Sequence, residues 1–179
     1  MKKNTLLAIS AAFVYSISAL GINSALAGTS EIRSEVTPSK LFYLKGEAPT
    51  GSRIPSIDAT SIIPFNKRFE ALTAEQQNLV KTRFDDLHNN DTPPFPTSGL
   101  RAIYKPLVNA NQAFGDNSDL NITAKINSSG FVSGIAVHNS GNPQLVSYIE
   151  QHLQLVKFEP ANCNGVACDM DFPIEISFN

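Results

Sequence analysis

The sequence contains few of the side chains that most enzymes and metal sites use. It has three histidines, and no cysteine or acidic residue is spaced to complete a metal-binding or nucleophilic set with His88, His138 or His152. It also lacks a glycine-rich phosphate loop, a zinc-ligand spacing and a nucleophile elbow. These absences favour a binding protein over an enzyme, and we expect no cofactor and no metal. A small enzyme of unknown chemistry remains an alternative, because catalytic residues that are distant in the sequence can converge in the fold.

Long apolar runs are absent except at the N-terminus. Residues 5–20 carry no charge, follow two lysines and precede the small-residue site at residues 25–27. This order is typical of a secretory signal peptide, which we expect to span residues 1–27 and to be cleaved before Gly28. The run is short for a membrane span, which needs about 20 residues. With no cysteine after the cleavage site, we expect a periplasmic protein with no lipid anchor and no mature membrane span.

An excess of positive charge is also missing. The chain carries 14 basic and 16 acidic residues, and the expected signal peptide removes two lysines and no acid, which leaves 12 − 16 = −4. Binding to nucleic acid or to an anionic membrane requires clustered positive charge. Composition therefore predicts neither partner.

Cysteine is limited to Cys163 and Cys168. In an exported protein, two cysteines so close in sequence favour a disulfide, and free thiols or a partial metal site are the alternatives. A metal would need two further ligands, and His152 stands alone. Closing so short a loop is expected to stabilise the fold by about 2 kcal/mol. Its role would be to fix the tight turn at Asn164-Gly165.

The first half of the mature chain predicts a leader followed by two helices. We expect residues 28–58 to be a loose or extended leader and residues 59–179 to form a single domain, with short strands possible between residues 40 and 65. Thr73 and Gln76 form a capping box for a helix over residues 72–88. A second amphipathic helix follows from residue 100, kinked or restarted at Pro106, and residues 109–118 are expected to be a connector.

From residue 119 onward, apolar residues recur at every second position, which is the spacing of a half-buried strand. Strands are expected at residues 120–126 and 131–138 around a turn, then a helix capped by Asn142 with Tyr148 on its buried side. A short strand at residues 155–159 and a final strand at residues 170–178 follow, and Pro173 gives the last strand an edge side. The order predicts an α+β fold, in which a strand-strand-helix-strand-strand sheet is packed by a helix and preceded by two helices.

Several pieces of residues 92–179 occur in a recognisable order. The extended Pro93-Pro94-Phe95-Pro96 segment comes first, and two strands around Gly130 and a helix follow. The chain then continues with Phe158-Glu159-Pro160-Ala161, the Asn164-Gly165 turn and an alternating strand that ends at an aromatic residue. In this order and spacing the segment resembles the TonB C-terminal domain family.

The resemblance implies a TonB C-terminal-like fold that binds a short receptor segment by strand addition at a sheet edge. It assigns partner contact to two segments, through the residues Pro93, Pro94, Phe95, Pro96, Phe172, Ile174, Ile176 and Phe178. The alternative for the first segment is a rigid connector, and for the second a plain core strand. The family's long proline-rich spacer is not evident, and Thr92 stands where the family often has glutamine.

The sequence leads to one favoured function and three alternatives. The favoured one is an exported periplasmic module that docks an envelope protein or peptide, such as a segment of an outer-membrane receptor. The alternatives are an energy transducer whose signal stays uncleaved as an anchor, a small periplasmic enzyme, and a structural envelope protein without a defined ligand.

Overall fold

The computed structural model describes residues 40–46, 58–85, 87–88, 90–114, 119–139 and 142–178. All of these belong to one unit, Pro38–Asn179. The expected signal peptide, its cleavage site and most of the leader lie outside the described residues. Within these ranges, no helix combines the length and the hydropathy of a membrane span.

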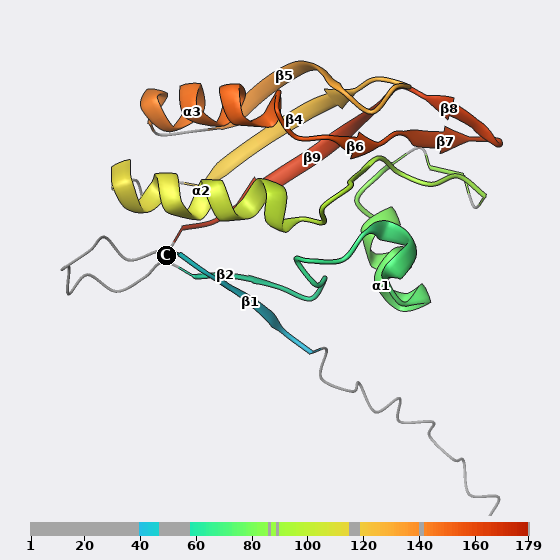
Figure 1. Ribbon diagram of the computed structural model, residues 1–179, viewed down its shortest axis with the longest axis horizontal. Helices are drawn as coiled ribbons and strands as arrows, with labels where there is room; N and C mark the ends of the chain where they lie inside the picture. The colour runs from blue at the N-terminus through green and yellow to red at the C-terminus, as the bar shows by residue number, and fades with distance from the viewer. Residues whose placement is uncertain are drawn as a thin grey trace, which may run out of the picture. The chain divides into compact units, whose positions relative to one another are not determined.

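A three-stranded antiparallel sheet forms the centre of the fold (Figure 1). The strand order is β5 (Val132–Asn139), β4 (Leu120–Ile126), β9 (Met170–Ile176). Every second side chain of β4 is buried, because alternate residues of a strand point to opposite faces of its sheet. One face therefore joins the core and the other faces solvent, and the predicted hairpin and final strand are confirmed.

Helices α2 (Arg101–Phe114) and α3 (Pro143–Leu153) pack against each other and share the core with the buried face of the sheet. The Asn142 side chain accepts hydrogen bonds from the first turn of α3, as predicted. The connector expected at residues 109–118 is wrong for residues 109–114, which continue α2. Ala110 in this extension is buried, so tertiary packing prolongs the helix beyond the apolar stripe seen in the sequence.

Tyr148 does not take the buried position expected of it. Its side chain is 40% exposed, and its ring stacks on His152 and meets Phe114 edge-on. Phe114, at the end of the extended α2 and itself 37% exposed, makes this contact at the surface rather than in the core.

The short strand expected at residues 155–159 is not part of the central sheet. Strand β6 contains only Phe158–Glu159 and pairs with β3 (Phe95–Pro96) in a separate ladder. Pro160 follows β6 at once, and a proline-rich segment offers few N–H donors, so the ladder stays short. The α+β class is confirmed, with three strands in the main sheet rather than four.

The N-terminal part adds a second small ladder and a helix. Strand β1 (Phe42–Lys45) pairs with β2 (Asp58–Ser61), so a strand occurs within the region expected to be leader. After a 3-10 turn at Phe69–Ala71, helix α1 (Ala74–Lys81) begins with the predicted Thr73–Gln76 capping box. It ends well before residue 88, because turn hydrogen bonds take over after Lys81.

The hairpin of β7 (Ala161–Cys163) and β8 (Val166–Cys168) is closed by the Cys163–Cys168 disulfide. Asn164 and Gly165 at its tip have φ of 52° and 87°. This left-handed pair is the geometry that a two-residue hairpin turn requires. The disulfide and the turn are both as the sequence predicts.

Candidate functional site

The proline segment assigned to partner contact lies in the interior. Pro93, Pro94, Phe95 and Pro96 are all buried. The backbone of this segment runs beside residues 157–162, and the Phe95 ring packs edge-on against the ring of Phe172 in β9. These side chains are packed into the C-terminal part, and Phe95 also lines a cavity beside β9.

The final strand is placed in a similar way. Phe172, Ile174 and Phe178 are buried in the core, and Ile176 is half-buried. Phe172 and Ile176 also line a cavity beside the strand, so a partner there would meet the backbone of the strand and parts of these two side chains.

The outer edge of β9 is a row of backbone groups that no described strand pairs with. The Tyr104 hydroxyl donates to the Glu175 carbonyl oxygen at 3.4 Å, so this carbonyl points away from β4. Since backbone direction alternates along an antiparallel strand, Asp171 and Pro173 face the same way. The edge thus presents the N–H of Glu175, while Pro173 contributes only a carbonyl.

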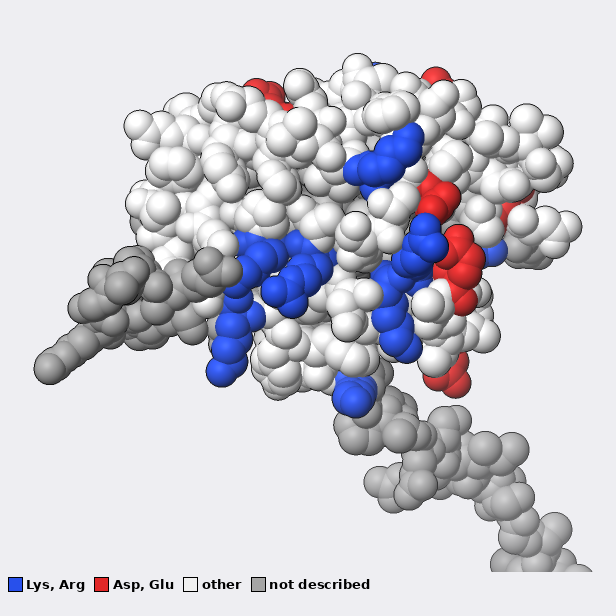
Figure 2. All heavy atoms as spheres, in the orientation of Figure 1, with Lys and Arg blue, Asp and Glu red and all other residues white. Residues whose placement is uncertain are grey.

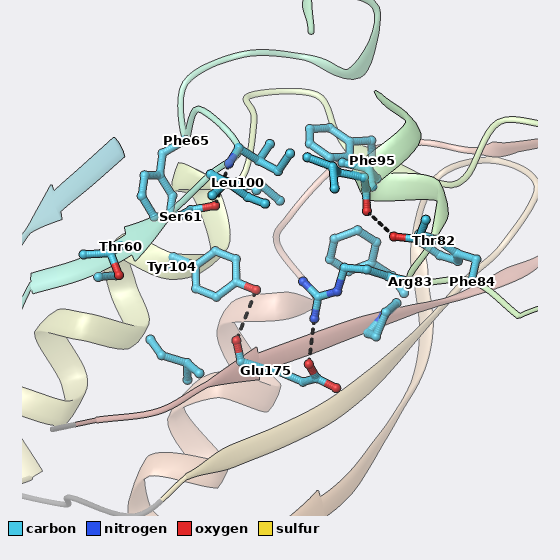
Figure 3. Close-up of a pocket in the computed structure, with 18 of the residues that line it drawn as sticks. Thr60, Ser61, Phe65, Thr82, Arg83, Phe84, Phe95, Leu100, Tyr104 and Glu175 are labelled. Atoms are coloured by element: carbon cyan, nitrogen blue, oxygen red, sulfur yellow. Dashed lines mark hydrogen bonds and ion pairs between the residues drawn. The ribbon is translucent and has the colours of Figure 1, made fainter. Parts of the chain in front are cut away.

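A cavity of about 700 Å³ lies along this edge (Figure 3). Its walls come from β2 and the residues after it, from the end of α1, from α2 and from β9. Most of the lining is apolar; it includes Ile63, Phe65, Val80, Phe84, Phe95, Leu100 and Phe172. A volume of this size lies within the range of natural ligand sites.

Two polar groups reach Glu175 from opposite walls of the cavity. The Arg83 guanidinium pairs with the Glu175 carboxylate at 3.0 Å, with both side chains partly exposed. The Tyr104 hydroxyl meets the backbone of the same residue. Burial raises the pKa of the Tyr104 phenol, and the nearby Arg83 cation opposes this rise. The site therefore places an arginine engaged with a carboxylate and a neutral hydroxyl engaged with a carbonyl beside a strand edge that no described strand pairs with.

Sequence reasoning did not single out Arg83, Tyr104 or Glu175. Tyr104 belongs to the amphipathic stripe of α2, which predicts burial and nothing more. Arg83 and Glu175 lie 92 positions apart, and no local pattern connects residues at such a separation. The cavity exists because β2 and α1 pack beside the C-terminal sheet.

Two of the three histidines make structural contacts elsewhere. His152 Nε2 lies 2.9 Å from the Ala102 carbonyl oxygen, and His138 Nε2 lies 2.8 Å from the Thr123 hydroxyl. Among the described residues, no group of histidine, cysteine and acidic side chains is placed to hold a metal ion. The arrangement is suited to binding an extended or apolar ligand.

Comparison of the chain with protein-family models, with curated proteins and with solved structures gives no match.

Proposed function

We propose that this protein is an exported binding module that docks an extended segment of an envelope protein or peptide. The segment pairs its backbone with the outer edge of β9 and places apolar side chains in the adjoining cavity. The observation that carries the proposal is that the unpaired strand edge and the 700 Å³ cavity coincide. An edge supplies hydrogen bonds to any extended chain, and the cavity would select its side chains.

The expected affinity is moderate. Each backbone hydrogen bond contributes about 0.5–1.5 kcal/mol, and each buried apolar side chain contributes about 1.5–3 kcal/mol. Ordering a flexible segment offsets part of this gain. A few residues docked in this way would bind with a Kd of about 1 μM.

Export to the periplasm is part of the proposal. The apolar N-terminal run supports it, and the Cys163–Cys168 disulfide is compatible with an oxidising compartment. The likeness of residues 92–179 to the TonB C-terminal domain family supports strand addition as the mode of docking. The mass of the mature protein tests the first point: a start at Gly28 is expected, and a retained N-terminus would favour the anchored energy transducer.

The polar lining of the cavity favours binding over catalysis. Its acidic residue, Glu175, is tied to its arginine, Arg83, and the neutral Tyr104 hydroxyl is held by a backbone carbonyl. General acid–base chemistry needs a group poised to exchange a proton near neutral pH, and a raised tyrosine pKa moves away from that range. These contacts support a recognition role.

A peptide-display experiment tests the proposal. Peptides would be selected against the mature protein, and their affinities for two tryptophan variants would be measured by fluorescence anisotropy. Thr60→Trp fills the cavity from β2 and is expected to weaken binding at least tenfold. Gln144→Trp, on an exposed position of α3, adds the same bulk elsewhere and is expected to bind as the wild type does.

Two results would contradict the proposal. One is the failure of display to yield any peptide that binds the folded domain. The other is a set of peptides whose affinity falls equally in both tryptophan variants, because such binding would not depend on the cavity.

A further inference from the structure

A second groove lies on the other side of α2, away from the β9 cavity. It has a volume of about 530 Å³ and runs between the start of α2 and the segment after α3. Of its ten lining residues, three are lysine or arginine and none is acidic: Arg101, Lys105 and Lys157 supply the charge. Its floor is apolar, with Ala102, Pro106 and Val156.

The cations converge from three parts of the chain. Arg101 and Lys105 are four residues apart on α2 and so project from the same helix face. Lys157 stands on the opposite wall. Arg68 adds a charge at the rim, because its Nε donates to the Thr97 carbonyl oxygen at 3.1 Å. Glu159 pairs with Arg68 at 3.0 Å and offsets its charge. The Lys105 ammonium donates to the Lys45 carbonyl oxygen at 2.7 Å, and the Lys157 ammonium donates to the Ser129 carbonyl oxygen at 2.6 Å, a neutral group that leaves the charge of Lys157 in place.

The overall composition conceals this charge. The chain has a formal net charge of −2, and a cluster of positive charge is not expected from its sequence. Figure 2 shows lysine and arginine side chains gathered over the face that carries α2, with acidic side chains mainly at the border of the group. Composition is an average over the whole chain and does not report such a local gathering of charge.

Apolar side chains stand out beside the cations. Leu155 is 83% exposed, more than any other large apolar side chain among the described residues. Phe131 is 53% exposed, and the Lys157 ammonium lies 3.3 Å from the centre of its ring. Exposed apolar tips flanked by lysine and arginine are the pattern of surfaces that rest in the headgroup region of a membrane.

We infer that this face docks reversibly on an anionic phospholipid surface. The phosphates contact Arg101 and Lys157, and Leu155 enters the interfacial region between headgroups. A phospholipid surface is favoured over an acidic protein segment because Leu155 projects from the face and would stay exposed beside a peptide lying in the groove. The β9 edge lies on the other side of α2, so both sites could be occupied together.

Vesicle co-sedimentation of the mature protein tests this inference. Vesicles of phosphatidylcholine with phosphatidylglycerol are expected to bind the protein, with binding that weakens as salt is raised, and vesicles of phosphatidylcholine alone are not. Arg101→Glu is expected to lower partitioning at least about fivefold, since each cation near an anionic surface contributes about that factor. The fold should tolerate it, because an acidic side chain is favourable in the first turn of a helix.

Two further variants keep the test specific. Lys125→Glu makes the same charge change on the open face of the sheet and is expected to leave partitioning within about twofold of the wild type. Leu155→Ser is expected to lower partitioning several-fold while the salt dependence stays the same. Equal losses in the two charge variants, or equal binding to both kinds of vesicle, would overturn the inference. Binding to polyglutamate without binding to vesicles would also overturn it and would make this face a protein-docking surface.

Discussion

Asn111 on α2 is fully buried, and neither its amide nitrogen nor its amide oxygen has a hydrogen-bond partner among the described groups. A buried polar group without a partner costs about 1–3 kcal/mol. Leucine has a similar volume and no polar atom to satisfy. Asn111→Leu is therefore expected to raise the free energy of unfolding by about 1–2 kcal/mol in urea titrations. A lower free energy of unfolding in this variant would contradict the prediction, because it would show that the Asn111 amide has hydrogen-bond partners in solution that leucine cannot replace.

Tyr104 gives the fold a dependence on alkaline pH. Burial raises the pKa of its phenol above the ordinary value of 10.0, so the folded chain holds this proton more tightly than the unfolded chain does. The stabilisation is complete below about pH 10 and is lost as the pH rises through the folded-state pKa. Tyr104→Phe cannot ionise, so its stability should fall less than that of the wild type between about pH 8 and pH 11. Chemical unfolding at both pH values measures this, and parallel losses would contradict the role of Tyr104.

At the scale of elements, a hydrogen bond links α3 to α2 at the place where Pro106 removes a backbone donor from α2. Proline has no N–H, so the Ala102 carbonyl four residues earlier lacks its normal helical donor. His152 of α3 fills this place, with Nε2 2.9 Å from that oxygen. Because a carbonyl only accepts, the Nε2 atom must carry the proton in this contact. The helix tolerates an internal proline because its neighbour supplies the missing hydrogen bond.

A double-mutant cycle tests this compensation. His152→Ala alone is expected to destabilise the fold by more than about 1 kcal/mol, because it leaves a carbonyl without a donor. In a Pro106→Ala background the helix supplies its own N–H, so the same change should cost less, with a coupling of about 1 kcal/mol. Additive losses in urea unfolding would show that His152 does not substitute for the missing donor.

Two turn glycines offer a matched comparison. Gly130 and Gly165 both have positive φ, at 77° and 87°, which favours glycine at each position. A Cβ at Gly130 would strike the Phe158 carbonyl oxygen, whereas a Cβ at Gly165 would meet nothing. Gly130→Ala is therefore expected to cost well over 2 kcal/mol, and Gly165→Ala about 1 kcal/mol. Thermal unfolding measures both, and equal losses would show that the contact between this turn and β6 is not tight.

For the molecule as a whole, the features that the sequence predicted correctly are those set by interactions between residues close together in the chain. The Thr73–Gln76 box, the Asn142 cap and the Asn164-Gly165 turn depend on neighbours within a few residues, and the structure confirms each of them. The alternation of β4 and β9 likewise follows from one residue to the next. Such signals survive in a single sequence because the partners are adjacent in it.

The candidate site was not predictable in the same way. The ladder of Phe95–Pro96 with Phe158–Glu159 and the contact of Arg83 with Glu175 join distant parts of the chain, and the positive face comes from three separate parts of it. Amino-acid composition is an average over the whole chain, so it reveals neither these long-range contacts nor the local concentration of positive charge. An edge side of the last strand was expected from Pro173, but the cavity beside it came from elements that the sequence pattern left undefined.

The central claim is that a ligand segment pairs with the outer edge of β9. The most direct test is amide hydrogen exchange of Glu175, measured by NMR with and without a display-selected peptide. The Glu175 N–H is expected to exchange rapidly in the free protein and to become protected in the complex, while Ile174, which faces β4, is protected in both. A bound peptide that leaves the exchange of Glu175 unchanged, or that protects the edge of β5 instead, would contradict this account.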